Sequence, residues 1–145
     1  MSERGVADEL KSSPDVRRMI CITCPLGCHL EVSVHDDTFL VSGNRCQRGE
    51  AYAREEVLNP RRTVTATCAA VLPDGRHPGP SDGIPRRVPV RTSQPFPRER
   101  IQELLDLLHT MEIQLPVKSG DMVVENALGT GIDVICTRSL DASGR

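Results

Sequence analysis

The chain has 145 residues, 18 basic and 20 acidic side chains and a formal charge of −2, which allow one domain or two very small ones. Only 38% of the residues are hydrophobic, with one tyrosine, two phenylalanines and no tryptophan, so we expect a thin core that leaves little room for an elaborate enzyme. No stretch approaches the roughly 18 uninterrupted apolar residues of a membrane span, and residues 1–18 contain no apolar leader segment. We therefore expect a cytoplasmic protein, in which cysteines are more often metal ligands or free thiols than disulfides.

The first part of the chain predicts a tail, a hairpin and a short helix. Residues 1–17 are polar and rich in turn formers, and we expect them to be disordered. Apolar and polar residues alternate over residues 30–34, a turn pair stands at residues 36–37, and an extended run resumes at residues 39–41. This pattern predicts a β-hairpin, which returns the chain to the end where the hairpin starts. A short helix within residues 49–60 is closed by an Asn-Pro pair.

The second part predicts a mixture of strands and one secure helix. Residues 62–72 and 86–92 are rich in β-branched residues, which predicts two extended runs. The proline in the second run is suited to an edge strand. Between them, residues 73–85 hold four prolines and three glycines, which predicts a mobile surface loop. Apolar residues recur at helical spacing over residues 98–111, after two prolines that favour a helix start.

Two further short strands are predicted at Met122–Val124 and Ile132–Thr137, around a glycine turn at residues 129–131. The predicted fold class is therefore α+β, with a small metal-cluster hairpin module followed by a part with one amphipathic helix and short strands. The predicted divisions are a tail at 1–17, a cysteine-rich module at 18–60, an α+β docking part at 61–138 and a tail at 139–145.

Four of the six cysteines have a spacing that suits a metal centre: Cys21-x2-Cys24-x3-Cys28-x17-Cys46. Three of them are local, and the predicted hairpin returns the fourth to their side. Four thiolates are what a structural zinc ion and a cubane iron–sulfur cluster both require. Zinc ribbons usually pair two Cys-x2-Cys knuckles, and Cys46 has no second cysteine at that distance, so the spacing favours iron–sulfur. Zinc and a reactive redox thiol remain alternatives.

The other two cysteines and two nearby arginines are interpreted differently from the four candidate ligands. Cys68 and Cys136 each share a strand face with apolar residues, which predicts small buried core side chains rather than ligands. Arg45 and Arg48 flank Cys46 and would place positive charge beside an anionic cluster, although they are also compatible with a solvated surface.

The runs CITCPLGCHLEV and VSGNRCQRGEAYAREE resemble the iron–sulfur segment at the N-terminus of molybdopterin oxidoreductases. From about Met19 to Arg138 the chain is also similar to the domain-of-unknown-function 1667 family, through GNRCQRGEAYAREE, NPRRTVTATC, VPVRTSQPFPRERIQEL and PVKSGDMVVENALGTGIDVICTR. The resemblance implies a [4Fe-4S] cluster on Cys21, Cys24, Cys28 and Cys46. It also implies a partner, because members of that family look to be encoded beside FAD-dependent oxidoreductases related to glycerol-3-phosphate dehydrogenase, or joined to them.

Arg48 matches the basic residue that lies between cluster and pterin in the molybdopterin enzymes. A chain of 145 residues has no room for the domains that bind a pterin, so we expect Arg48 to face a partner's cofactor instead. Residues 61–100 carry 8 basic and 3 acidic side chains, which predicts a docking surface for an acidic partner or a balance of charge within the chain.

Nucleic acid is a poor fit as a partner, because the net charge is negative and stacking aromatic residues are missing. The sequence contains no paired carboxylates, nucleophile–base pair or phosphate loop that would indicate catalysis by this chain alone. The expected function is an iron–sulfur electron-transfer subunit that acts with an FAD-dependent oxidoreductase. The alternative is a zinc-binding structural or interaction module without redox activity.

Overall fold

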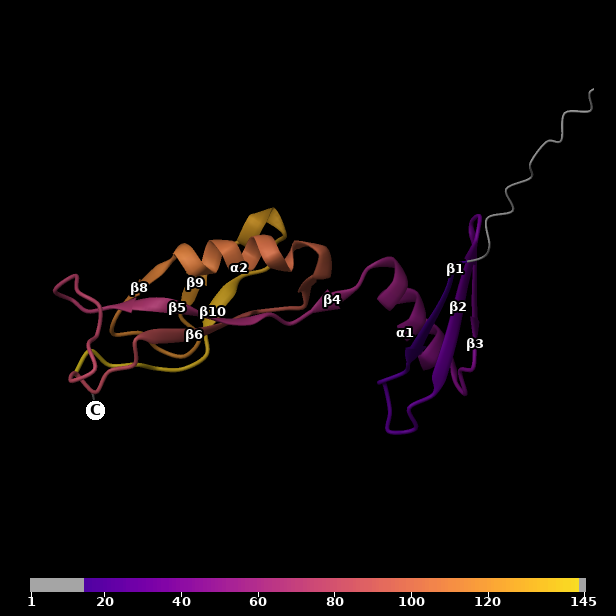
Figure 1. The fold of residues 1–145 in the computed structure, drawn as a ribbon, viewed down its shortest axis with the longest axis horizontal. Helices are drawn as coiled ribbons and strands as arrows, with labels where there is room; N and C mark the ends of the chain where they lie inside the picture. Colours follow the sequence, from indigo (N-terminus) through magenta and orange to yellow (C-terminus); the bar gives the residue numbers. More distant parts are fainter. Residues whose placement is uncertain (1–14, 144–145) are drawn as a thin grey trace, which may run out of the picture. The chain divides into compact units, whose positions relative to one another are not determined.

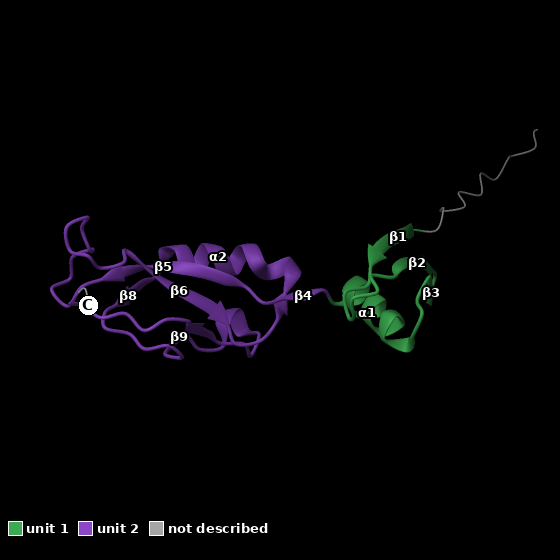
Figure 2. Ribbon diagram, turned by 90° about the horizontal axis from the view of Figure 1, so that it is seen from below, with its two compact units in different colours: residues 1–59 green, residues 60–145 purple. Residues whose placement is uncertain are grey.

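The computed structural model describes residues 15–143, and they fall into two compact units, of which the first ends at Asn59 and the second begins at Pro60 (Figure 2). The sequence places this boundary one residue later, after Pro60. Within the described residues, two α-helices, two short 3₁₀ helices and three sheets make the fold α+β, as predicted. Within residues 15–143 no helix has the length and apolar character needed to cross a membrane.

The first unit is a three-stranded antiparallel sheet with one helix (Figure 1). The predicted hairpin is formed by β2 and β3, whose turn residue Asp36 has a φ of 48°. The predicted helix is α1, which begins two residues before Gly49. The elements are β1 (Asp15–Ile20), β2 (His29–His35), β3 (Thr38–Ser42) and α1 (Gln47–Leu58), in the sheet order β1-β2-β3.

Strand β1 is a correction to the predicted disordered tail. The tail was expected to reach residue 17, but β1 starts at Asp15 and pairs along its whole length with β2. Its side chains are mostly exposed, so its sequence lacks the apolar alternation that marks a half-buried strand. Residues 1–14 of the predicted tail lie outside the described residues.

The core of the first unit is small. Leu30 and Val32 alternate with exposed residues along β2 and are buried on one face, where Ala53 of α1 is also buried. Cys21 is the fourth fully buried member of this cluster. With so few buried side chains, the unit gains little stability from apolar burial alone.

The second unit contains a five-stranded sheet in the order β8-β5-β6-β10-β9, in which β5 and β8 are parallel and the other pairs antiparallel. A separate two-stranded sheet joins β4 and β7. The strands are β4 (Arg61–Arg62), β5 (Thr65–Val71), β6 (Arg87–Thr92), β7 (Phe96–Pro97), β8 (Glu112–Gln114), β9 (Met122–Val124) and β10 (Val134–Cys136). The short helices are η1 (Arg98–Arg100) and η2 (Ala127–Gly129).

The helix predicted at residues 98–111 consists of η1 followed by α2 (Ile101–Thr110). Figure 1 shows α2 lying along β5, and the two elements are in contact. Leu104 and Leu108, one turn apart, are fully buried against the sheet, as their spacing predicts.

The proline in β6 does not mark an edge, contrary to the prediction, because β6 is the central strand of the sheet. Pro89 is tolerated there because the β6–β10 ladder ends at this point: the last register pair joins Cys136 to Val90. The carbonyl of Pro89 still accepts the N–H of Thr137 at 3.0 Å. Only the reciprocal bond, which would need an N–H on residue 89, is missing.

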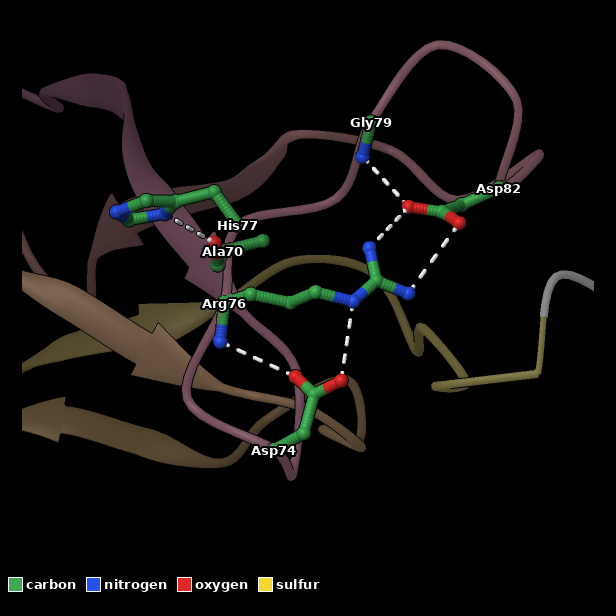
Figure 3. Close-up of polar contacts among 6 residues, drawn as sticks. All are labelled: Ala70, Asp74, Arg76, His77, Gly79 and Asp82. Carbon is green, nitrogen blue, oxygen red and sulfur yellow. Dashed lines mark hydrogen bonds and ion pairs between the residues drawn. The ribbon is translucent and has the colours of Figure 1, made fainter.

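The loop predicted to be mobile is held together by its own side chains (Figure 3). The guanidinium of Arg76 donates to Asp82 at 2.7 and 3.3 Å and to Asp74 at 3.0 Å. Asp82 also accepts the N–H of Gly79 at 2.6 Å. The strands on either side of the loop, β5 and β6, pair as an antiparallel hairpin.

The predicted C-terminal tail at residues 139–145 is wrong at Leu140. This residue is only 6% exposed and belongs to the core of the second unit. It forms an isolated antiparallel bridge with Val117, with N–H to carbonyl distances of 3.0 and 2.9 Å. The side chain adds apolar burial that an isolated tail would not have.

Candidate metal centre

The strand order places the four candidate cysteines at one end of the first sheet. Cys21 directly follows β1, whereas Cys24 and Cys28 lie in the connection from β1 to β2. Cys46 lies four residues after the end of β3 and is the residue that precedes the first turn of α1. Because β1, β2 and β3 are antiparallel neighbours, the end of β1, the start of β2 and the end of β3 meet at the same end of the sheet.

The connection that carries Cys24 is closed at its base by a hydrogen bond from the N–H of Cys21 to the carbonyl of Cys28, at 2.8 Å. This bond extends the β1–β2 ladder by one pair beyond Ile20 and His29. Gly27 has a φ of +59°, a conformation that L side chains rarely adopt. The base of the loop therefore fixes the backbone of two candidate ligands next to each other.

A close backbone contact brings the fourth cysteine toward the first three. Gly43 has a φ of +83°, and a Cβ atom at this position would overlap with the carbonyl oxygen of His29. Glycine is needed here for both reasons. The segment that leads to Cys46 therefore runs directly against the residue that follows Cys28.

The start of α1 makes the Cys46 thiol acidic. The pKa of Cys46 is lowered from its usual value, first by the N–H of Gly49 and then by the side chain and N–H of Arg48. These donors stabilise the thiolate, and a helix N-terminus favours negative charge. Cys46 is exposed, so its sulfur is accessible to a ligand.

The other three thiols have different surroundings. The sulfur of Cys21 is buried and lies 3.0 Å from the hydroxyl of Thr23, with which it shares a hydrogen bond. Cys24 and Cys28 are half-buried. All six cysteines within residues 15–143 are free thiols. In this same range, no three cysteine, histidine or carboxylate side chains are arranged so that they could share a metal ion.

The structure thus brings the backbones of the four cysteines to one end of the first sheet. Their sulfur atoms are not close enough together to share a metal ion. Of the two arginines predicted to lie next to a cofactor, Arg48 is two residues after Cys46, and its side chain lowers the pKa of that thiol. Arg45 is exposed, and no hydrogen bond or ion pair of its side chain occurs within residues 15–143.

Thr23 and Gly49 are the contacts that sequence reasoning missed. Thr23 lies between two candidate ligands, and its hydroxyl was not considered as a partner for a thiol. The N–H of Gly49 donates to the carbonyl of Cys46 at 3.1 Å and is the first cause of the lowered pKa of the Cys46 thiol. Its place three residues after a cysteine that precedes a helix was a signal, because that is where N-terminal helix donors point.

Cys68 and Cys136 are core residues, as predicted. They are 0% and 1% exposed and lie among apolar residues of the second unit. Burial raises the pKa of both thiols, so they remain protonated at neutral pH. Neither belongs to the candidate centre.

The predicted basic segment contributes exposed arginines to the second unit. Arg86 and Arg91 are exposed, and Arg91 donates only to the carbonyl of Thr92, at 3.3 Å. Arg87 is exposed but is held by the hydroxyl and the carbonyl of Thr67. None of these three arginines forms an ion pair within the part of the chain that the structure describes.

Comparison with known proteins gives one family. No curated protein matches the chain. Among solved structures, the NMR structure of Clostridium perfringens protein CPE0013, a Northeast Structural Genomics target, is similar, with 22% identity and a TM-score of 0.47. The match covers 59% of this chain and 89% of that chain. A family described as protein of unknown function, DUF1667, matches residues 47–138, starting directly after Cys46. Since this match spans more than half of its residues, the chain belongs to the DUF1667 family.

Proposed function

We propose that residues 15–59 form a metal-binding module that holds a [4Fe-4S] cluster through four thiolates, those of Cys21, Cys24, Cys28 and Cys46. The observation that carries this proposal is that all four cysteines lie at one end of the sheet. The strand order and the contact of Gly43 with His29 bring them there. A donor set made only of thiols suits iron–sulfur iron or zinc rather than magnesium or calcium. Binding requires the Cys21 thiol to lose its proton, after which its sulfur can only accept the hydrogen bond that it shares with the Thr23 hydroxyl.

The surroundings of Cys46 fit a ligand of an anionic centre. The N–H of Gly49 and the side chain and N–H of Arg48, all in the first turn of α1, lower the pKa of its thiol, and Arg48 adds a positive charge nearby. Donors of this kind lower the free energy of a negatively charged group at a helix start. In this proposal Arg48 balances charge at the centre, whereas Arg45 contributes charge from the exposed surface.

A cluster of this kind, when bound, supplies one-electron transfer. We place the chain as an electron-relay subunit of an FAD-dependent oxidoreductase related to glycerol-3-phosphate dehydrogenase, on the strength of the sequence resemblance. Exposed apolar side chains around the cysteine loop support a protein partner at this end of the sheet: Ile20, Ile22 and Leu26 are 53%, 76% and 67% exposed. Apolar residues grouped on a surface in this way often mark a protein contact.

The test is anaerobic purification of the whole chain, followed by visible absorbance, iron and acid-labile sulfide analysis. We expect a brown protein with iron and sulfide in equal amounts. Replacing any one of the four candidate cysteines by serine should lower the iron content, while Cys68→Ala and Cys136→Ala serve as matched controls that keep it. Full iron in Cys46→Ser would contradict the proposed site.

Zinc is the second candidate, and the small core of the first unit favours it. Only four residues of this unit are fully buried as apolar side chains, so a structural metal would add stability that the core lacks. A colourless protein with one zinc per chain, lost in the same four serine variants, would support this structural role. Electron transfer would then be excluded.

A further inference from the structure

A cleft of about 710 Å³ opens within the second unit. One side is formed by Gly83 and Pro85, at the end of the Pro/Gly-rich loop. The other side is formed by residues 116–119 and 138–141, which run next to each other. Its volume falls within the range of about 300 to 1,000 Å³ that is usual for sites that bind small molecules.

Hydrogen bonds hold both sides of the cleft in place. Val117 and Leu140 are joined by two reciprocal backbone bonds, and the N–H of Ser119 donates to the hydroxyl of Ser139 at 2.9 Å. On the opposite side, Asp82 immediately precedes Gly83 and is fixed by Arg76 (Figure 3). The cleft is therefore formed before any ligand enters, which lowers the entropic cost of binding.

The charged side chains of the cleft have no partner among the described residues. Lys118 and Arg138 both line it, and neither side chain forms a hydrogen bond or ion pair within residues 15–143. Asp141, the one acidic residue of the lining, is also unpaired in this range. Two cations against one carboxylate give the cleft a positive charge. The hydroxyl of Ser139 accepts one bond, so its own proton is free to be donated.

We propose that this cleft binds a small organic anion through its phosphate or carboxylate group. Lys118 and Arg138 contact the charged group, because arginine and lysine both donate charge-assisted hydrogen bonds to such oxygens. The carbon part of the ligand lies against the apolar surface of Pro85 and Pro116. This proposal does not depend on the metal centre of the first unit.

The test is an NMR titration of the ¹⁵N-labelled full chain with inorganic phosphate and, separately, with succinate. We expect saturating shifts confined to the N–H groups of Gly83, residues 117–119 and residues 138–141. Saturation by phosphate at the lower concentration would identify a phosphate ligand, and the reverse order would identify a carboxylate. Lys118→Gln with Arg138→Gln should weaken binding by about tenfold or more. Asp141→Asn should strengthen it, because it removes the opposing charge.

The matched control is Arg61→Gln with Arg98→Gln. This variant lowers the net charge by the same amount, but at exposed residues that do not line the cleft. The proposal is overturned if neither anion saturates, if the Lys118/Arg138 variant binds as well as the unchanged chain, or if the control variant loses as much affinity. The last result would mean diffuse attraction to positive charge. Iron or zinc content should be the same in all these variants, which keeps this result distinct from the test of the metal centre.

Discussion

Gly43 lies against the carbonyl oxygen of His29 so closely that no side chain fits between them. This contact joins the segment before Cys46 to the start of β2, directly after Cys28. A backbone contact therefore sets how near the fourth candidate ligand comes to the other three.

We expect Gly43→Ala to destabilise the first unit by about 2 kcal/mol or more, because it combines a φ of +83° with overlap of the new Cβ and a backbone oxygen. Metal content should fall with stability. Gly27→Ala is the control in the same unit, since its φ is +59° but its nearest neighbour would be 3.8 Å away. It should cost about 1 kcal/mol, the strain of the left-handed conformation alone. Urea unfolding measures both; equal losses would show that the contact with His29 is unimportant.

Thiol alkylation of the metal-free chain should follow the pKa differences. Cys46 is exposed and its pKa is lowered, so more of it is thiolate at neutral pH and it should react first with iodoacetamide. Its rate should fall only when the pH drops below this lowered pKa. Arg48→Gln removes one of the stabilising donors and should shift the rate profile to higher pH, without abolishing the effect of Gly49. Mass spectrometry after short pulses identifies the modified residue; an unchanged profile would separate Arg48 from the thiol.

Cys68→Ala and Cys136→Ala should each cost about 1 kcal/mol, the loss of one buried group of the size of a methylene or sulfur atom. Both thiols are buried in the second unit, so neither should react with iodoacetamide until that unit unfolds. Denaturant unfolding followed by alkylation measures both effects. Rapid modification of either cysteine in the folded chain would show that the core is open there.

The contact of Asp82 with Arg76 should respond to acid. Donation by Arg76, and then by the N–H of Gly79, holds the pKa of Asp82 below its usual range. The contact is therefore complete above the ordinary carboxyl pKa of about 3.9 and is lost as the pH falls through the lowered value of the folded state. The NMR shift of the Gly79 N–H should follow this titration.

Asp82→Asn tests the same contact at neutral pH. Trypsin should cleave after Arg76 faster in this variant, because the guanidinium loses one of its two charged partners. The thermal midpoint should stay nearly unchanged, because the pair is partly exposed. Glu99→Gln, a change at an exposed carboxylate without a partner in the described residues, is the control. Equal cleavage of both variants would show that the loop is held by other means.

The spacing of apolar residues in the sequence predicted those strands and helices that bury one face in a core. The β2–β3 hairpin and α2 follow from alternation and helical spacing, because each places its apolar residues toward a core. Strands β1 and β8 were missed for a different reason. β1 is mostly exposed, and β8 has three residues whose pairing partner, β5, lies far away in the chain. Such strands exist only through their neighbours.

The sequence predicted that the four cysteines come to one end of the hairpin, but it did not predict the contacts around them. Cysteine spacing and the hairpin identify which residues lie at one end of the sheet, since both depend on local sequence. The contact of the Cys21 thiol with Thr23, and that of Gly43 with His29, depend on how the loops pack. Central placement of Pro89 was unpredictable in the same way, because it depends on where β10 ends.

The last strand of the chain lies inside the sheet of the second unit rather than at its edge. β10 stands between β6 and β9, and β9 pairs with no other strand. During synthesis, the sheet of the second unit therefore stays incomplete until Cys136 has left the ribosome. A product that stops before Val134 would expose the long edge of β6 to strands of other molecules and leave β9 without a partner. Termination or cleavage of the chain before Val134 would thus yield a fragment that tends to aggregate.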